Sequence, residues 1–139
     1  MKKVLSLVLA VALAAGCAST GGVKKGAYVG LSVAGQALFL IQDTEMGLVC
    51  ERPGAPAAPA CVPETVHRTE ISPRLAKAFG LGERASDVIR AIPPTITGPT
   101  PEVLNLVSQI WDLIGEIRAL LPASETKKLS SELDKLAAK

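Results

Sequence analysis

Apolar residues recur at helical spacing along the second half of the chain, and the clearest stripe lies within residues 101–121. Apolar side chains repeat there every three or four positions, while polar side chains occupy the opposite face. Thr100 precedes the stripe as a cap, Pro101 suits the first helical position, and Pro122 ends it. The stripe consists of Val103, Val107, Ile110, Ile114, Ile117 and Leu121. The pattern predicts a long amphipathic helix that needs a broad apolar partner.

A second apolar stripe covers residues 27–49 and predicts another amphipathic helix, of about five turns. Gly26, Gly30 and Ala34 recur every fourth residue, a spacing that lets two helices pack closely. The uncharged stretch ends at Asp43 and falls short of the ~20 apolar residues that a membrane-spanning helix needs. We therefore expect this helix to pack against another helix and not to cross a bilayer.

Two shorter helices are expected in the middle of the chain. Ser72 is a good N-cap and Gly80 a suitable C-cap, which predicts a helix over residues 72–80. A second short helix is expected over residues 83–92, and Pro93 stops it.

The remaining segments complete an all-α fold. Residues 64–71 are expected to form a loop or a short extended piece, residues 93–101 a stiff proline-rich connector, and the tail from Ser124 a terminal amphipathic helix. The sequence thus predicts a small helical domain of about four to five helices over residues 27–139. Aromatic residues make up only 3% of the chain, so aliphatic side chains must build its core.

The first residues form a separate segment with the composition of an export signal. Lys2 and Lys3 precede an uncharged apolar run over residues 4–15, which is too short for a permanent span. The run ends in "LAAGC", residues 13–17, which resembles the lipobox of bacterial lipoproteins. Ala14 stands where that family commonly has leucine. The alternative is an ordinary secretory signal that happens to be followed by a cysteine.

The resemblance implies an address and an anchor. Residues 1–16 would be a signal peptide that is removed by cleavage between Gly16 and Cys17. Cys17 would then carry diacylglycerol on its sulfur atom and a fatty acyl chain, such as palmitate, on its new amine. Ala18, in place of the aspartate that retains such proteins at the inner membrane, implies the periplasmic face of the outer membrane. Two or three acyl chains hold a protein stably at a bilayer. Residues 17–26 are expected to be the lipidated cysteine and a flexible tether.

Charge excludes one class of partner. The chain has 15 basic and 13 acidic residues, and removing Lys2 and Lys3 with the signal peptide leaves 13 of each. A neutral mature chain has no electrostatic footprint for nucleic acid.

Cys50 and Cys61 remain once the lipid has taken Cys17. In an exported protein an even pair favours a disulfide, which would close the proline-rich loop over residues 51–63. The alternative is a metal site with His67, but the three residues lack zinc spacing and a fourth ligand. We expect the closed loop, bending at Gly54, and no metal.

The long helix offers a candidate partner surface. Leu104 and Trp111 extend its apolar stripe sideways and could bind another subunit. The favoured interpretation of most of the stripe is burial against the helix over residues 27–49 within one chain.

Catalytic and cofactor motifs are missing from the sequence. The stretch Gly30-x-Ser32-x-Ala34 approaches a nucleophile elbow, but it lies inside a helical pattern without the required strand and turn. His67 is the single histidine, and we expect it to be a surface or partly buried residue. There is no phosphate-binding loop and no cofactor motif. A hydrolase is therefore disfavoured.

The expected function is that of a membrane-anchored, non-enzymatic envelope lipoprotein that binds or supports another envelope protein. One alternative is a phage lysis lipoprotein of the outer-membrane spanin kind, which the cysteine anchor and the prolines resemble. Another is a secretion pilot lipoprotein. The apolar helices favour a folded domain over the extended chain that would reach across the periplasm.

Overall fold

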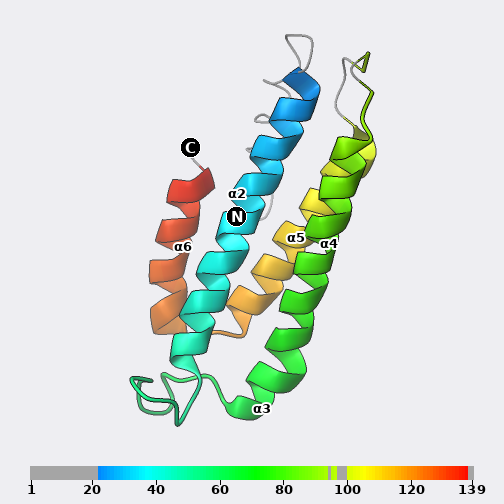
Figure 1. Ribbon diagram of the computed structural model, residues 1–139. Helices are drawn as coiled ribbons and strands as arrows, with labels where there is room; N and C mark the ends of the chain where they lie inside the picture. Colours follow the sequence, from blue (N-terminus) through cyan, green and yellow to red (C-terminus); the bar gives the residue numbers. More distant parts are fainter. Residues whose placement is uncertain (1–21, 94, 97–99, 138–139) are drawn as a thin grey trace.

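In the described part of the chain, four long helices run up and down one axis, each antiparallel to the next (Figure 1). The computed structural model describes residues 22–93, 95–96 and 100–137. The four helices are α2 (Gly22–Leu48), α4 (Ser72–Arg90), α5 (Pro101–Ala119) and α6 (Ala123–Ala137). The predicted all-α fold is confirmed.

Helix α5 carries the most continuous buried face, as its stripe predicts. Val103, Val107, Ile110, Ile114 and Ile117 are all buried. Helix α5 packs mainly on α4, and α2 packs on α4, α5 and α6. The partner that the stripe needs is therefore supplied within the chain, as expected, but mainly by α4 and only in part by the helix over residues 27–49 that the favoured interpretation named. The core is aliphatic, in keeping with the low aromatic content.

Residues 64–90 form one continuous helical rod, and this corrects two predictions. The segment expected to be a loop consists of a helical turn, α3 (Glu64–Val66), and a π-helical stretch, η2 (His67–Ile71). The two short helices expected after it are the single helix α4, which runs through Gly80 and Gly82. Ser72 is consequently inside the rod and caps nothing.

Burial explains why the glycines do not stop α4. The buried residues of the rod keep helical spacing across both glycines, which holds one face of the rod against the core. They are Ile71, Leu75, Ala78, Ala85 and Ile89. A helical glycine costs about 1 kcal/mol relative to alanine, less than the burial of one large aliphatic side chain contributes. The helix therefore continues through Gly80, although a glycine in this context could end it as a C-cap.

Helix α2 begins earlier than predicted. Residues 22–26 are helical, although the sequence suggests a flexible tether over residues 17–26. Gly26, Gly30 and Ala34 are buried, as their spacing predicts. None of the helices in the described residues combines the length and the hydropathy that a membrane-spanning segment needs.

The bundle has two distinct ends (Figure 1). The disulfide end holds the loop after α2, α3 and the turn between α5 and α6. The connector end holds the start of α2 and the connection between α4 and α5. Gly16 and Cys17, the predicted cleavage and lipidation residues, lie outside the described residues.

Candidate functional site

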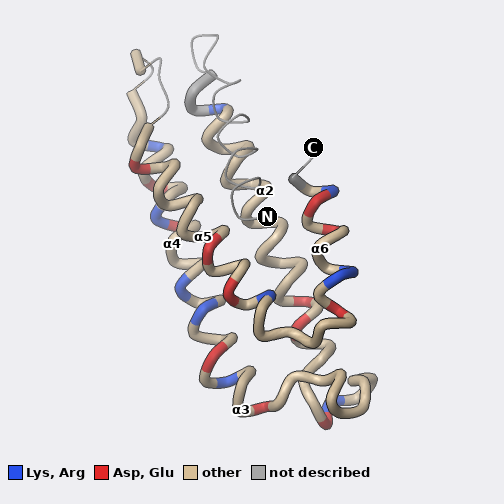
Figure 2. Tube along the Cα trace, turned by 180° about the vertical axis from the view of Figure 1, so that it is seen from behind, with Lys and Arg blue, Asp and Glu red and all other residues tan. Residues whose placement is uncertain are grey.

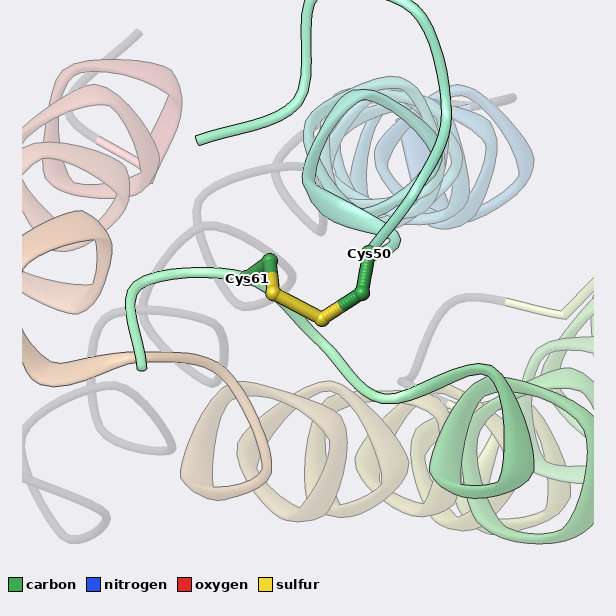
Figure 3. Close-up of a disulfide and its surroundings, with 2 residues drawn as sticks. All are labelled: Cys50 and Cys61. Carbon is green, nitrogen blue, oxygen red and sulfur yellow. A yellow bond between two sulfur atoms is a disulfide. The ribbon is translucent and has the colours of Figure 1, made fainter. Parts of the chain in front are cut away.

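The loop at the disulfide end is closed by a bond between Cys50 and Cys61 (Figure 3). Their Cα atoms are 5.0 Å apart. The Val62 amide donates to the Leu48 carbonyl at 2.7 Å, and the Cys50 amide donates to the Val62 carbonyl at 2.8 Å. The chain turns at Gly54, whose φ is 81°, where the sequence predicts the bend. The loop thus returns the chain to the end of α2 and fixes where the helical rod begins.

A contact between the buried Glu45 carboxyl group and the His67 imidazole joins α2 to this rod. Glu45 is fully buried, and its Oε1 contacts Nδ1 of His67, whose side chain is 16% exposed. The second carboxylate oxygen of Glu45, Oε2, is buried without a hydrogen-bond partner. His67 is the first residue of the π-helical stretch, so the pair pins this irregular segment to α2.

The pair does not build a catalytic site with the serine of the elbow-like stretch. Ser32 lies 13 residues before Glu45 on α2, a separation of about 20 Å along the helix. Its Oγ accepts a hydrogen bond from Nε2 of Gln36 at 3.4 Å. The residues described in the structure include no group of three or more His, Cys, Asp and Glu side chains placed to hold a metal.

Glu45 is a functional candidate that was not among the predicted residues, although the sequence carries a signal for its burial. Position 45 falls on the same helical face as Leu38, Ile41 and Leu48, which are all buried. A charged residue on such a face is rarely buried unless it has a partner. Spacing alone does not identify His67 as that partner, because 22 residues separate it from Glu45 in the sequence.

Leu104 and Trp111 lie at the edge of the core. Both are partly buried and pack against the hydrophobic cluster formed by the helices. The Nε1 atom of Trp111 is buried and has no hydrogen-bond partner. The more exposed large apolar side chains are found elsewhere, and most of them lie on α2.

An aromatic pair stands on the outside of the contact between α2 and α4. The ring centroids of Phe39 and Phe79 are 5.3 Å apart, with the planes tilted by 54°. Phe39 is nevertheless 60% exposed, and Met46, two turns further along α2, is 48% exposed. A paired aromatic side chain that remains mostly in water leaves much of its apolar surface available to a partner.

Two helical glycines lie beside this pair. A Cβ atom added at Gly35 or at Gly82 would meet nothing within 4 Å, so the packing of this chain does not require glycine at either position. Because α2 and α4 are antiparallel, Gly35 and Gly82 both lie about one turn from the rings toward the connector end (Figure 1). We call Gly35, Phe39, Met46, Phe79 and Gly82 the aromatic seam.

Two acidic residues lie along the seam, Asp43 between Phe39 and Met46, and Glu83 next to Gly82. Asp43 follows Phe39 by one turn of α2, Glu83 follows Phe79 by one turn of α4, and both are exposed. The seam therefore combines apolar side chains with two negative charges.

The contact between α4 and α5 carries hydrogen bonds between charged side chains instead of an exposed aromatic pair. Arg74 of α4 donates from Nε to Glu116 of α5 at 3.0 Å and from Nη1 to Glu70 at 2.8 Å. These hydrogen bonds, that to Glu70 first, raise the pKa of the Arg74 guanidinium above its ordinary value. Charged groups of the chain thus satisfy one another at this contact, whereas the aromatic seam presents apolar groups to solvent.

A comparison with protein-family models, curated proteins and solved structures finds no match to this chain.

Proposed function

We propose that this protein is a lipid-anchored envelope lipoprotein with a non-enzymatic role, and that it binds another envelope protein through the aromatic seam. The anchor rests on the lipobox-like stretch that ends at Cys17. The binding role rests chiefly on one observation, the largely exposed ring of Phe39 against Phe79.

The chemistry of the seam indicates the kind of partner. Gly35 and Gly82 offer room for close backbone approach, and the rings and Met46 offer apolar contact along about two turns of α2. A helix with an apolar stripe fits such a surface, as in other recognition grooves. Basic residues one turn on either side of that stripe would face Asp43 and Glu83. The partner we propose is therefore a helix with an apolar stripe flanked by lysine or arginine.

Two further observations favour a binding module. Glu45 and His67 hold the fold together and lie far from Ser32, which leaves no assembled nucleophile and base among the residues described. Helix α2 is about 40 Å long and the other helices pack alongside it, a shape that suits docking better than the extended reach of a spanin.

The anchor is tested by metabolic labelling with a fatty acid. The full-length chain should incorporate label, and Cys17→Ser should lose it and accumulate as uncleaved precursor. Cys50→Ser is the matched control, because it removes a cysteine of the same chain and should keep the label. Label that survives in Cys17→Ser would contradict the lipoprotein assignment.

The seam is tested by photocrosslinking in cells that make the lipidated protein. A photoreactive phenylalanine analogue at Phe39 should form a discrete adduct with another envelope protein. The same analogue at Asp112, on the exposed face of α5, is the control and should form none. The combined change Asp43→Lys and Glu83→Lys should weaken the adduct, because it would repel a partner with basic flanks.

The identity of the adduct decides the proposal. An adduct of twice the mass of the chain would assign the seam to self-association and contradict a different envelope partner. Equal adducts from Phe39 and Asp112 would show no preference for the seam and would also contradict it.

A further inference from the structure

We infer that the connector end of the bundle docks directly on the lipid surface, so that the helices stand upright on the membrane. This inference rests on the proposed lipid anchor at Cys17. It adds a second, non-covalent contact between the folded domain and the bilayer, made by the side chains of one end of the bundle.

The length of the chain before α2 limits how far this end can lie from the bilayer. Five peptide steps separate Cys17 from Gly22, and they reach at most about 18 Å when fully extended. The disulfide end is not limited in this way, because it lies about 40 Å further along α2. A lipidated Cys17 would therefore keep the connector end beside the membrane in every orientation of the domain.

The connector end is apolar where it would meet lipid. Ile96, in the connection between α4 and α5, is 43% exposed. Tyr28 and Val29 are exposed on α2, about 10 Å from its start. Tyrosine is enriched at membrane interfaces, where its ring meets acyl chains and its hydroxyl meets water. These side chains come from separate segments of the same end.

A hollow deepens the apolar surface around Ile96. It has a volume of about 530 Å³ and lies between the end of α4 and the start of α5. Its lining includes Val88, Ile92, Pro93 and Pro101, and Glu102 is the one charged residue that lines it. The hydroxyl of Thr100, which also lines it, is buried without a hydrogen-bond partner. Insertion of lipid chains or of the glycerol backbone of a lipid would fill a hollow of this composition.

Charge separates the connector end from the rest of the surface. No charged residue occurs between Arg90 and Glu102, and Figure 2 shows the described part of this connection free of the charges that mark the helices. Lys25 is exposed near the start of α2, where it can meet anionic headgroups. Glu102, exposed at the start of α5, is the one carboxylate that lines the hollow, whereas the aromatic seam carries both Asp43 and Glu83, which an anionic membrane would repel. Charge therefore favours an upright bundle over one that lies on its seam.

Tryptophan reporters in the lipidated protein test this orientation. The protein is reconstituted in phosphatidylethanolamine and phosphatidylglycerol vesicles that contain lipids brominated on their acyl chains. In a Trp111→Phe background, the Ile96→Trp reporter should shift its emission to the blue and lose intensity to the bromine. The Met46→Trp reporter, at a similarly exposed position near the disulfide end, is the matched control and should be unaffected.

A second pair of variants tests whether side chains of this end act together. The Tyr28→Trp reporter should also be quenched, and adding Ile96→Asp should relieve that quenching, because a carboxylate at the interface would lift the end from the lipid. Adding Asp112→Asn in place of Ile96→Asp should leave the quenching unchanged. Should Trp111→Phe lower the melting temperature, the same comparisons are made with Trp111 retained and the emission of the unsubstituted protein subtracted.

Each result separates this inference from the proposed function. Fatty-acid labelling together with an unquenched Ile96→Trp reporter would overturn the docking and leave the anchor intact. Equal quenching of the Ile96→Trp and Met46→Trp reporters would show a bundle lying flat and would also overturn it. A lack of fatty-acid label would remove the anchor itself, on which the inference rests.

Discussion

Removal of the His67 side chain is expected to destabilise the bundle strongly, because it leaves the buried carboxylate of Glu45 with no partner. Oε1 of Glu45 contacts Nδ1 of His67, and Oε2 is already buried without one. Removing one partner so that a buried charge is left uncompensated costs about 3–5 kcal/mol. His67 is 16% exposed, so water can enter in its place, and we expect a loss in the free energy of unfolding near the lower value, about 3 kcal/mol.

That loss is large for a domain of this size. Small domains are held by about 5–15 kcal/mol in total, and a loss of about 3 kcal/mol would lower the melting temperature by about 10–15 °C. Thermal and urea unfolding followed by circular dichroism, at constant pH and with the disulfide intact, would measure both quantities.

A companion variant separates the contact between Glu45 and His67 from the packing around it. Glu45→Met removes the buried charge, fills a similar volume and should change stability much less than His67→Ala. The double variant Glu45→Met with His67→Ala should then be more stable than His67→Ala alone, and the cycle gives the coupling free energy between the two side chains. If His67→Ala has the same melting temperature as the parent protein, the buried Glu45 side chain does not need His67 as a partner, and the reasoning is refuted.

Three other predictions follow from burial and packing. Gly35→Ala should raise the free energy of unfolding by about 0.5–1 kcal/mol, because the added Cβ meets nothing in the chain. The same variant should weaken crosslinking from the seam, and a stabilised variant with unchanged crosslinking would argue against close backbone approach of a partner. Ile110→Asp should lower the free energy of unfolding by several kcal/mol and unfold the domain, whereas the control Asp112→Ala should have the melting temperature of the parent protein. If Ile110→Asp stays folded and has a smaller apparent mass, α5 is instead a binding surface. Cys50 and Cys61 should resist alkylation until reduced, and reduction should cost roughly 3 kcal/mol; immediate alkylation of both in the native protein would exclude the bond.

The long helix α5 could be predicted from sequence because all its determinants are local. Pro101 fits its first position, Pro122 follows its end, and the stripe between them keeps one spacing throughout. The disulfide loop could be predicted for a similar reason, since only two cysteines remain after Cys17. The π-helical stretch over residues 67–71 could not, because it depends on packing of Ile71 and on the contact of His67 with a distant part of α2.

The aromatic seam could not be predicted because exposure is a property of neighbours in space. Spacing alone assigns Phe79 to an apolar face, and it gives no reason for Phe39 to remain in water. Likewise, Gly80 has the sequence context of a helix end, but the rod continues through it because both flanking turns bury aliphatic side chains. The residues that suggest function, such as Phe39, are therefore those whose exposure in the fold differs from what the local sequence pattern predicts.

The two proposed surfaces fit together in one geometry. Phe39 lies 17 residues from the start of α2, about 25 Å along the helix from the connector end. An upright bundle would hold the aromatic seam at that height above the lipid and leave it open to the aqueous side. The short segment after Cys17 and the docked end would together restrict rotation of the domain, which raises the effective concentration of the seam for a partner in the same membrane. A weak apolar contact at Phe39 and Phe79 would then suffice for stable association, which explains how a seam of few side chains could serve as the binding site.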